Sequence, residues 1–258
     1  MVTVEKVLND IEKNQMAPVY LVLGEEQVNA EKIKQKLIAN FPEEEREFNI
    51  GIYDMEEVTL STALADAMSV PFFGEKRLVF INRPYFLTGE AKKVKLEHDL
   101  DELIAYVNDP EPTTVLVLMA PYAKLDERKK VVKQIKQKAV VVDNSPLTEM
   151  AVRKHLLAEL AQKGYTIDPR ALEILLQRTD ANLTAIANEL PKLLLVAEDK
   201  QITVNEVSAM VSRSLEQNVF DLVELVLQKD TAKALELYRD LLQQKEEPLK
   251  INAILEGQ

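Results

Sequence analysis

The feature that most constrains the fold is a series of short, continuous apolar runs separated by segments whose apolar residues recur at helical spacing. Val/Ile/Leu-rich runs of strand length, alternating with amphipathic helices, are typical of a parallel sheet that is covered on both faces. We therefore predict an α/β domain with a parallel five-stranded sheet, in an order that the sequence does not specify. The predicted strands are 19–23, 47–53, 78–81, 114–119 and 139–142, and the predicted helices are 26–40, 58–68, 94–107 and 125–137.

The pattern changes at residues 143–146, Asp-Asn-Ser-Pro, after which every apolar pattern has helical spacing and we predict no strand. Helix starts are indicated by acceptor side chains at Thr148 and Asp168 and by the capping-box spacing of Thr203 and Glu206, and a further helix is predicted over 182–198. The last helical pattern stops at Gln258 without an apolar partner. We expect three domains: an α/β domain over 1–143, a small helical bundle over 144–212, and the incomplete beginning of a third, helical domain over 213–258.

The turn after the first long strand lacks the residues that bind phosphate. In an α/β domain of this type, phosphate sits at that turn, cradled by glycine amides at a helix N-terminus. A phosphate loop would require glycine, lysine and serine or threonine at positions that here hold Asn29, Ala30 and Glu31. Two glutamates also follow Gly24 directly and add negative charge. We predict that this turn does not bind a nucleotide.

The sequence also lacks the motifs of other common catalytic and metal sites. The chain has no cysteine, which excludes thiol catalysis and thiolate metal sites, and its two histidines fall on different predicted domains. No Gly-x-Ser-x-Gly motif is present, and no window is long and apolar enough for a membrane-spanning helix. We predict no catalytic residue, metal or cofactor, and we expect a reducing compartment such as the cytoplasm.

Charge is distributed unevenly along the chain. The net charge of −11 argues against unaided binding of nucleic acid. Residues 41–60 carry seven acids against one base, whereas residues 124–138 carry seven bases against two acids. The basic segment is predicted to be helical, and two interpretations stay open: a solvated surface, or a face that meets DNA or an acidic neighbouring subunit.

One loop combines adjacent aromatic residues with stiff flanks. Val70, Pro71, Phe72 and Phe73 lie between a predicted helix and a predicted strand and are followed by Gly74. An exposed apolar pair on a short turn indicates a surface that another molecule covers. The alternative is that both rings fold back under the edge of the sheet as ordinary core.

The chain resembles the delta subunit family of the bacterial DNA polymerase III clamp loader, in its Gram-positive form. The segments that carry this resemblance are 18–26 (PVYLVLGEE), 67–79 (AMSVPFFGEKRLV), 164–165 (GY), 180–194 (DANLTAIANELPKLL) and 218–222 (NVFDL). The resemblance implies an AAA+-like α/β domain whose ATPase site has been lost, a helical lid bundle and the start of a helical collar domain.

In that family the delta subunit binds no ATP, grips the ring-shaped sliding clamp and helps to open it for loading onto primed DNA. The resemblance places the gripping residues at Val70, Pro71, Phe72 and Phe73, although many members have an aliphatic residue at the position of Phe72. It also implies the following partners: the sliding clamp (beta subunit), the delta-prime subunit, the ATPase subunits of gamma/tau type, and DNA within the assembly only. The chain would then be a non-catalytic subunit of the DNA-directed DNA polymerase holoenzyme, with no membrane partner.

Two other function classes remain compatible with the sequence. One is an active ATPase of the same architecture, and the other is a helical adaptor or regulator that binds DNA directly. The turn at Gly24 argues against the first and the net charge of −11 against the second.

Overall fold

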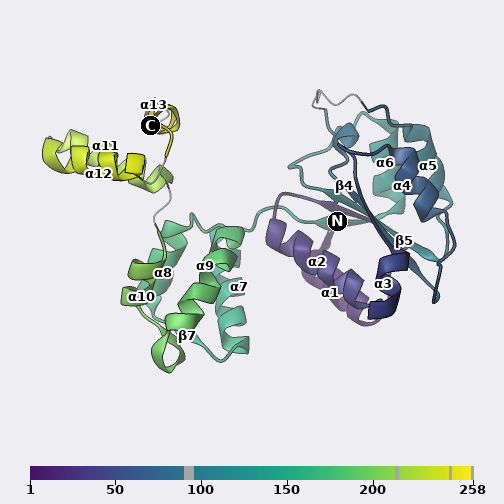
Figure 1. Cartoon of the computed structure of the whole chain (residues 1–258), viewed down its shortest axis with the longest axis horizontal. Helices are drawn as coiled ribbons and strands as arrows, with labels where there is room; N and C mark the ends of the chain where they lie inside the picture. The colour runs from purple at the N-terminus through teal and green to yellow at the C-terminus, as the bar shows by residue number, and fades with distance from the viewer. Residues whose placement is uncertain (90–95, 213–214, 244–245, 257–258) are drawn as a thin grey trace. The chain divides into compact units, whose positions relative to one another are not determined.

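The computed structural model describes residues 1–89, 96–212, 215–243 and 246–256. These residues form two compact units, Met1–Pro146 and Leu147–Gln258. The first unit contains the sheet and the second is mainly helical (Figure 1). Each unit is described separately below.

The first unit is built around a six-stranded sheet in which all neighbouring strands are parallel. The strand order is β1-β6-β2-β5-β4-β3. The predicted parallel α/β architecture is therefore confirmed. The strands are β1 (Val2–Thr3), β2 (Val19–Leu23), β3 (Ile50–Asp54), β4 (Arg77–Asn82), β5 (Thr114–Ala120) and β6 (Val140–Asp143).

Successive residues of the inner strands enter two separate cores, one on each face of the sheet. In β2, Leu21 packs into the core that also contains α4 (Leu60–Ala67), α5 (Leu100–Asn108) and α6 (Lys130–Lys138). Tyr20 and Val22 pack into the core that contains α1 (Val4–Glu12) and α2 (Gln27–Ala39). Figure 1 shows the two helical layers with the sheet between them. The unit also contains helix α3 (Glu43–Asn49) and a 3-10 turn, η1 (Tyr85–Leu87).

Two features at the ends of the sheet differ from the sequence prediction. A sixth strand, β1, pairs with β6 at one edge; its two residues are too few to produce a recognisable pattern. The strand predicted to begin at Glu47 begins at Ile50, because residues 43–49 form helix α3. Three glutamates occupy the first turn of α3, where negative charge interacts favourably with the helix dipole.

Helices α5 and α6 also begin later than predicted. Residues 94 and 95 of the predicted helix 94–107 lie outside the described residues, and α5 begins at Leu100, where Asp99 caps it. The predicted helix 125–137 begins only at Lys130, because Asp126 accepts from the backbone and guanidinium of Arg128 in a preceding turn. This contact lowers the pKa of the Asp126 carboxyl to about 2. The seven bases of residues 124–138 therefore do not share a single helix.

The second unit contains helices and one short sheet that the sequence prediction missed. Strands β7 (Thr166–Ile167) and β8 (Gln201–Ile202) pair in parallel; two residues each are too short to show alternation. The helices are α7 (Glu149–Gln162), α8 (Pro169–Arg178), α9 (Leu183–Val196), α10 (Val204–Met210), α11 (Leu215–Leu227), α12 (Thr231–Gln243) and α13 (Pro248–Glu256), with a 3-10 turn η2 (Glu198–Lys200). Helices α11 to α13 share their own apolar cluster. The division into three domains stays a prediction.

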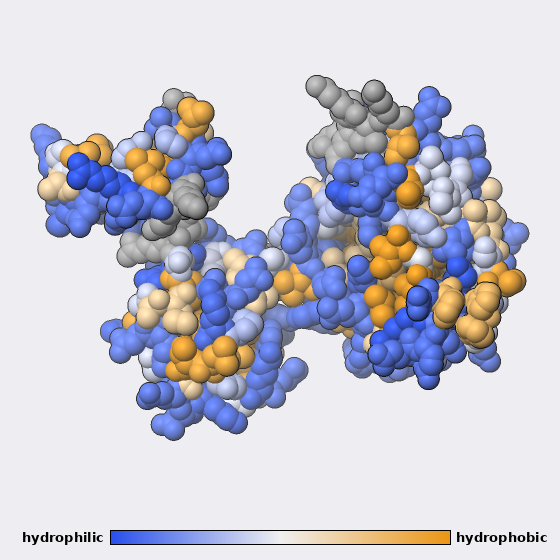
Figure 2. Space-filling model, viewed as in Figure 1, coloured by the Kyte–Doolittle hydropathy of each residue, from blue (hydrophilic) through white to orange (hydrophobic). Residues whose placement is uncertain are grey.

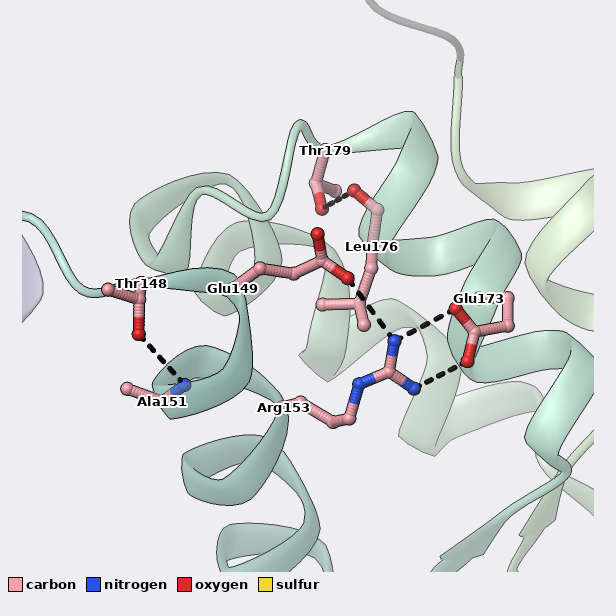
Figure 3. A network of polar contacts seen from close by, with 7 residues as sticks. All are labelled: Thr148, Glu149, Ala151, Arg153, Glu173, Leu176 and Thr179. Atoms are coloured by element: carbon pink, nitrogen blue, oxygen red, sulfur yellow. Dashed lines mark hydrogen bonds and ion pairs between the residues drawn. The ribbon is translucent and has the colours of Figure 1, made fainter.

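A surface network joins α7 to α8 (Figure 3). The guanidinium of Arg153 donates to both carboxylate oxygens of Glu173, at 2.5 and 2.8 Å, and to Glu149 at 3.3 Å. Thr148 caps the same helix by accepting from the Ala151 amide. Because the carboxylates are well exposed, water screens these ion pairs and they contribute little to stability.

The ends of β2 and β6 are locked together at Gly24. The Asn144 amide nitrogen donates to the Gly24 carbonyl at 3.2 Å and to the Glu26 carbonyl at 2.9 Å, and the Glu26 N–H donates back to the Asn144 carbonyl. Gly24 has a φ of +137°, and a Cβ there would lie 2.1 Å from the Asn144 backbone. Only glycine fits this position without displacing the main chain.

His98 has a structural role, as its isolation in the sequence predicts. Its Nδ1 accepts from the Leu60 N–H at 3.1 Å, at the first turn of α4, and its Nε2 lies 2.9 Å from the Tyr85 hydroxyl. Accepting at Nδ1 requires the neutral ring in the tautomer that is protonated at Nε2. Burial lowers the pKa of His98 below its usual 6.5.

We expect Gly24→Ala to lower the free energy of unfolding by about 2–4 kcal/mol, because the new methyl group must displace the Asn144 backbone at a strained φ. The matched control is Gly89→Ala, where a Cβ would lie 3.7 Å from its nearest neighbour, Asp126; its effect should stay within about 0.5 kcal/mol. Urea denaturation measures both. Equal effects would contradict this account of the junction.

We expect the His98 contact to make stability depend on pH. Above the unfolded pKa of about 6.5 the ring is neutral in both states, and its full contribution is present. As the pH falls below that value, the unfolded chain takes up the proton first, so stability is lost down to the folded pKa. Wild type should therefore lose more stability than His98→Asn between about pH 7.5 and about pH 5, measured by thermal unfolding. Parallel losses would show that another group is responsible.

Candidate functional site

The predicted docking loop connects α4 to β4 and lies on the surface of the first unit. Val70 is 75% exposed, Phe72 69% and Phe73 51%, while Pro71 is half-buried. The alternative of two core phenylalanines is wrong, because more than half of each side chain is open to solvent. Hydrophobic surface on this unit gathers beside strongly hydrophilic surface (Figure 2).

A third aromatic ring from another element completes the exposed group. Phe48, near the end of α3, is 46% exposed and stacks on Phe72 with ring centroids 5.5 Å apart. It also meets Phe73 edge to face at 5.5 Å, while Phe72 and Phe73 meet edge to face at 4.8 Å. Such geometries are the favourable ones for aromatic pairs. We name Phe48, Phe72 and Phe73 the aromatic cluster.

The neighbouring residue, Asn49, fixes the backbone of the loop. Its side chain is fully buried; its Oδ1 accepts from the Phe72 N–H at 2.8 Å, and its Nδ2 donates to the Phe73 carbonyl. One amide group thus satisfies the main chain of both loop phenylalanines. The sheet brings the segments together, because β3 pairs with β4 in a register that sets Ile50 opposite Leu78.

Local contacts fix the two ends of the loop. At its start the Ser69 hydroxyl donates to the Ala65 carbonyl at 2.9 Å, satisfying an acceptor at the end of α4. At its end Gly74 adopts a φ of +67°, and a Cβ there would overlap the carboxylate of Glu45. Beyond it Arg77 pairs with Asp66 of α4, and both side chains are largely buried. The aromatic cluster therefore rests on a constrained backbone.

Phe48 and Asn49 were not identified from the sequence. They were predicted to lie in a strand, where their nearness to the loop is not evident. The sequence does contain one signal: Phe48 directly follows the acidic segment 43–47, and Asn49 directly precedes the strand that begins at Ile50. Their place beside the loop depends on strand order, which local patterns do not contain.

The turn after β2 is filled by the chain itself. Glu26 is buried and caps α2 by accepting from the Val28 N–H, so a carboxylate occupies the helix N-terminus at which phosphate would bind. Of the residues that mark the absent phosphate loop, Gly24 contacts Asn144, Asn29 is buried, and Glu31 is exposed on α2.

A cavity of about 230 Å³ lies at the carboxyl ends of the strands, where α/β proteins often bind ligands. Gly24, Ala30, Asp54, Arg83 and Asn144 are among its lining residues. The guanidinium of Arg83 pairs with Asp54 and, at 2.9 Å, with Glu56. These carboxylates raise the pKa of Arg83 and neutralise the cation that a phosphate would need.

The described residues contain neither a metal-binding group nor a membrane-spanning helix. Within them, no group of three or more His, Cys, Asp or Glu is arranged to hold a metal ion. Over the same ranges, no helix has the length and apolarity needed to cross a membrane. His155, the second histidine, lies 3.9 Å from Glu159 on the same helix.

Family models and a relative identify the family of this chain. The model of the DNA polymerase III delta subunit matches residues 20–145, and that of its C-terminal domain matches residues 216–258. The DNA polymerase III subunit delta of Bacillus subtilis (strain 168) is 39% identical over 257 residues, which are 98% of this chain and 73% of that protein. The structure of the Bacillus subtilis DNA clamp loader delta protein matches with a TM-score of 0.71 and 36% identity, over 98% of this chain and 76% of that one. The chain belongs to the DNA polymerase III delta subunit family.

Proposed function

We propose that this protein is a clamp-loader subunit that hydrolyses no ATP and grips the sliding clamp through Val70, Pro71, Phe72 and Phe73, helping to open it for loading onto primed DNA. The observation that carries the proposal is the exposed aromatic pair on a constrained loop, in a member of the delta subunit family. Two large apolar side chains on a pre-ordered turn can fill a groove at low entropic cost.

The rest of the chain supports an assembly role. Within the assembly the proposed partners are delta-prime, the gamma/tau-type ATPase subunits and DNA, and the proposed compartment is the cytoplasm. We assign clamp binding to residues 1–143, a lid role to 144–212 and a collar role to 213–258. The apolar cluster shared by α11 to α13 is consistent with a separate collar segment.

Two contacts support the absence of ATPase activity. The Val28 N–H donates to the Glu26 carboxylate and the Glu26 N–H donates to the Asn144 carbonyl, so two backbone donors that could hold phosphate are already bonded within the protein. The cation in the nearby cavity, Arg83, is paired with two acidic side chains. A triphosphate would have to displace all of these contacts.

We expect Phe72→Ala/Phe73→Ala to weaken binding to the cognate sliding clamp at least about 100-fold, because buried aromatic anchors contribute about 2–4 kcal/mol each. Surface plasmon resonance with immobilised clamp measures the change. Phe220→Ala is the matched control, since Phe220 is 58% exposed on α11 and lies outside the proposed site. If the double variant bound as tightly as wild type, the assignment of the loop would be wrong.

We expect no binding of ATP with Mg²⁺ to the purified chain by isothermal titration calorimetry, because the phosphate-binding turn is closed by Glu26 and Asn144. A phosphate-loop ATPase run in the same buffer serves as the positive control. Measurable, saturable ATP binding would favour the active-ATPase alternative. Tight DNA binding by the isolated chain at physiological salt would instead favour the DNA-binding adaptor.

A further inference from the structure

Resting on the proposed clamp binding, we infer that the docking surface has two parts: the loop 70–73 and the C-terminal end of α3. In this arrangement Phe48 is a third contact ring and Asn49 is the positioning residue of the loop. The partner that fits this surface has a groove that is apolar at its centre and basic at its rim.

Phe48 qualifies as a contact residue by its geometry. Its ring touches both loop phenylalanines, at 5.5 Å in each case, yet it remains 46% exposed. A groove deep enough to receive Phe72, on which Phe48 stacks, would reach the exposed edge of Phe48 as well. The three rings therefore form one continuous apolar surface with a fixed shape.

Asn49 positions the loop from beneath the aromatic cluster. Because its side chain is fully buried, it cannot touch a partner. Its two hydrogen bonds hold the backbone at Phe72 and Phe73 and so select one loop conformation out of those that residues 69–74 could adopt. Fixing that conformation before binding removes an ordering cost that the complex would otherwise carry.

The charge around the rings sets the chemistry of the partner. Glu44, Glu47 and Glu75 are exposed on the two segments that carry the aromatic cluster. Three bases lie on those segments: Arg46 donates to the Phe41 carbonyl at 3.0 Å, Arg77 pairs with Asp66, and Lys76 lies 3.4 Å from the side-chain oxygen of Asn14. The glutamates on the same segments outnumber them: Glu43, Glu44, Glu45, Glu47 and Glu75. The rim therefore presents negative charge, which complements lysine and arginine side chains around an apolar groove.

Binding kinetics separate the two roles. We expect Phe48→Ala to weaken clamp binding about tenfold through faster dissociation, because a contact is lost. Asn49→Ala should instead slow association, because only the fraction of molecules with the ordered loop can bind.

Glu47→Gln should reduce the rate of association with the clamp about threefold at low salt and make that rate less dependent on salt, because one negative charge at the rim is lost.

The experiment uses the full chain and the cognate sliding clamp in surface plasmon resonance, with hydrogen exchange of the Phe72 amide as a second readout. Leu157→Ala is the matched control, because Leu157 is 44% exposed in the other unit. In Asn49→Ala, the Phe72 amide should lose protection while the amides of β2 and β5 keep theirs. Uniform loss across the sheet would mean a purely structural role and would overturn the assignment of Asn49.

The outcomes distinguish this inference from the function on which it rests. If Phe72→Ala/Phe73→Ala abolishes binding while Phe48→Ala and Asn49→Ala bind like wild type, the two-part surface is refuted and clamp binding stands. If the folded wild type does not bind the clamp, both are refuted. Since Phe48 and Glu47 are exposed, their variants should fold even if Asn49→Ala does not.

Discussion

Burial of the sheet on both faces is the constraint on which the rest of the first unit depends. Alternate side chains of β2, β4 and β5 enter opposite cores, so both faces are covered by helices and neither is open to a ligand. The surfaces of the sheet that a ligand or partner can reach are therefore at the ends of the strands. The turn at Gly24 and the cavity beside Arg83 lie at the carboxyl ends, whereas Asn49 and Phe73 precede β3 and β4 and so lie toward the amino ends. The proposed docking surface and the turn at Gly24 therefore lie at opposite ends of the strands of one sheet.

The pairing of β3 with β4 converts a loop into a surface. Helix α3 precedes β3, and the loop 70–73 precedes β4. Because Ile50 lies opposite Leu78, the end of α3 and the loop lie next to each other. Phe48 then stacks on Phe72, and Asn49 reaches the main chain of both phenylalanines. A shift of one residue in this register would turn the side chains of β3 to the other face and separate the two segments.

Local patterns predicted the parts of this fold that depend on local physics. The buried strands of 19–23 and 114–119 are continuous apolar runs, and the helix start at Thr148 follows from its capping side chain. Asp168 precedes α8 as predicted, but its side chain makes no capping hydrogen bond. The exposed loop was visible because Pro71 and Gly74 bracket two aromatics. Strand order, the two-residue strands β1, β7 and β8, and the role of Asn49 could not be read, since each depends on residues far apart in the chain. The helix over 43–49 was missed because its apolar content is low.

The hydrogen bonds at Gly24 have a consequence for when the proposed docking surface is available. The Gly24 carbonyl and the Glu26 main chain bond to Asn144, and the Glu26 carboxylate accepts from the first turn of α2. Under the proposed function this turn binds no nucleotide, so it keeps one shape whether nucleotide is scarce or abundant. The proposed function then has the aromatic cluster exposed at all times, and the timing of partner binding and release would be set by the molecules around this chain.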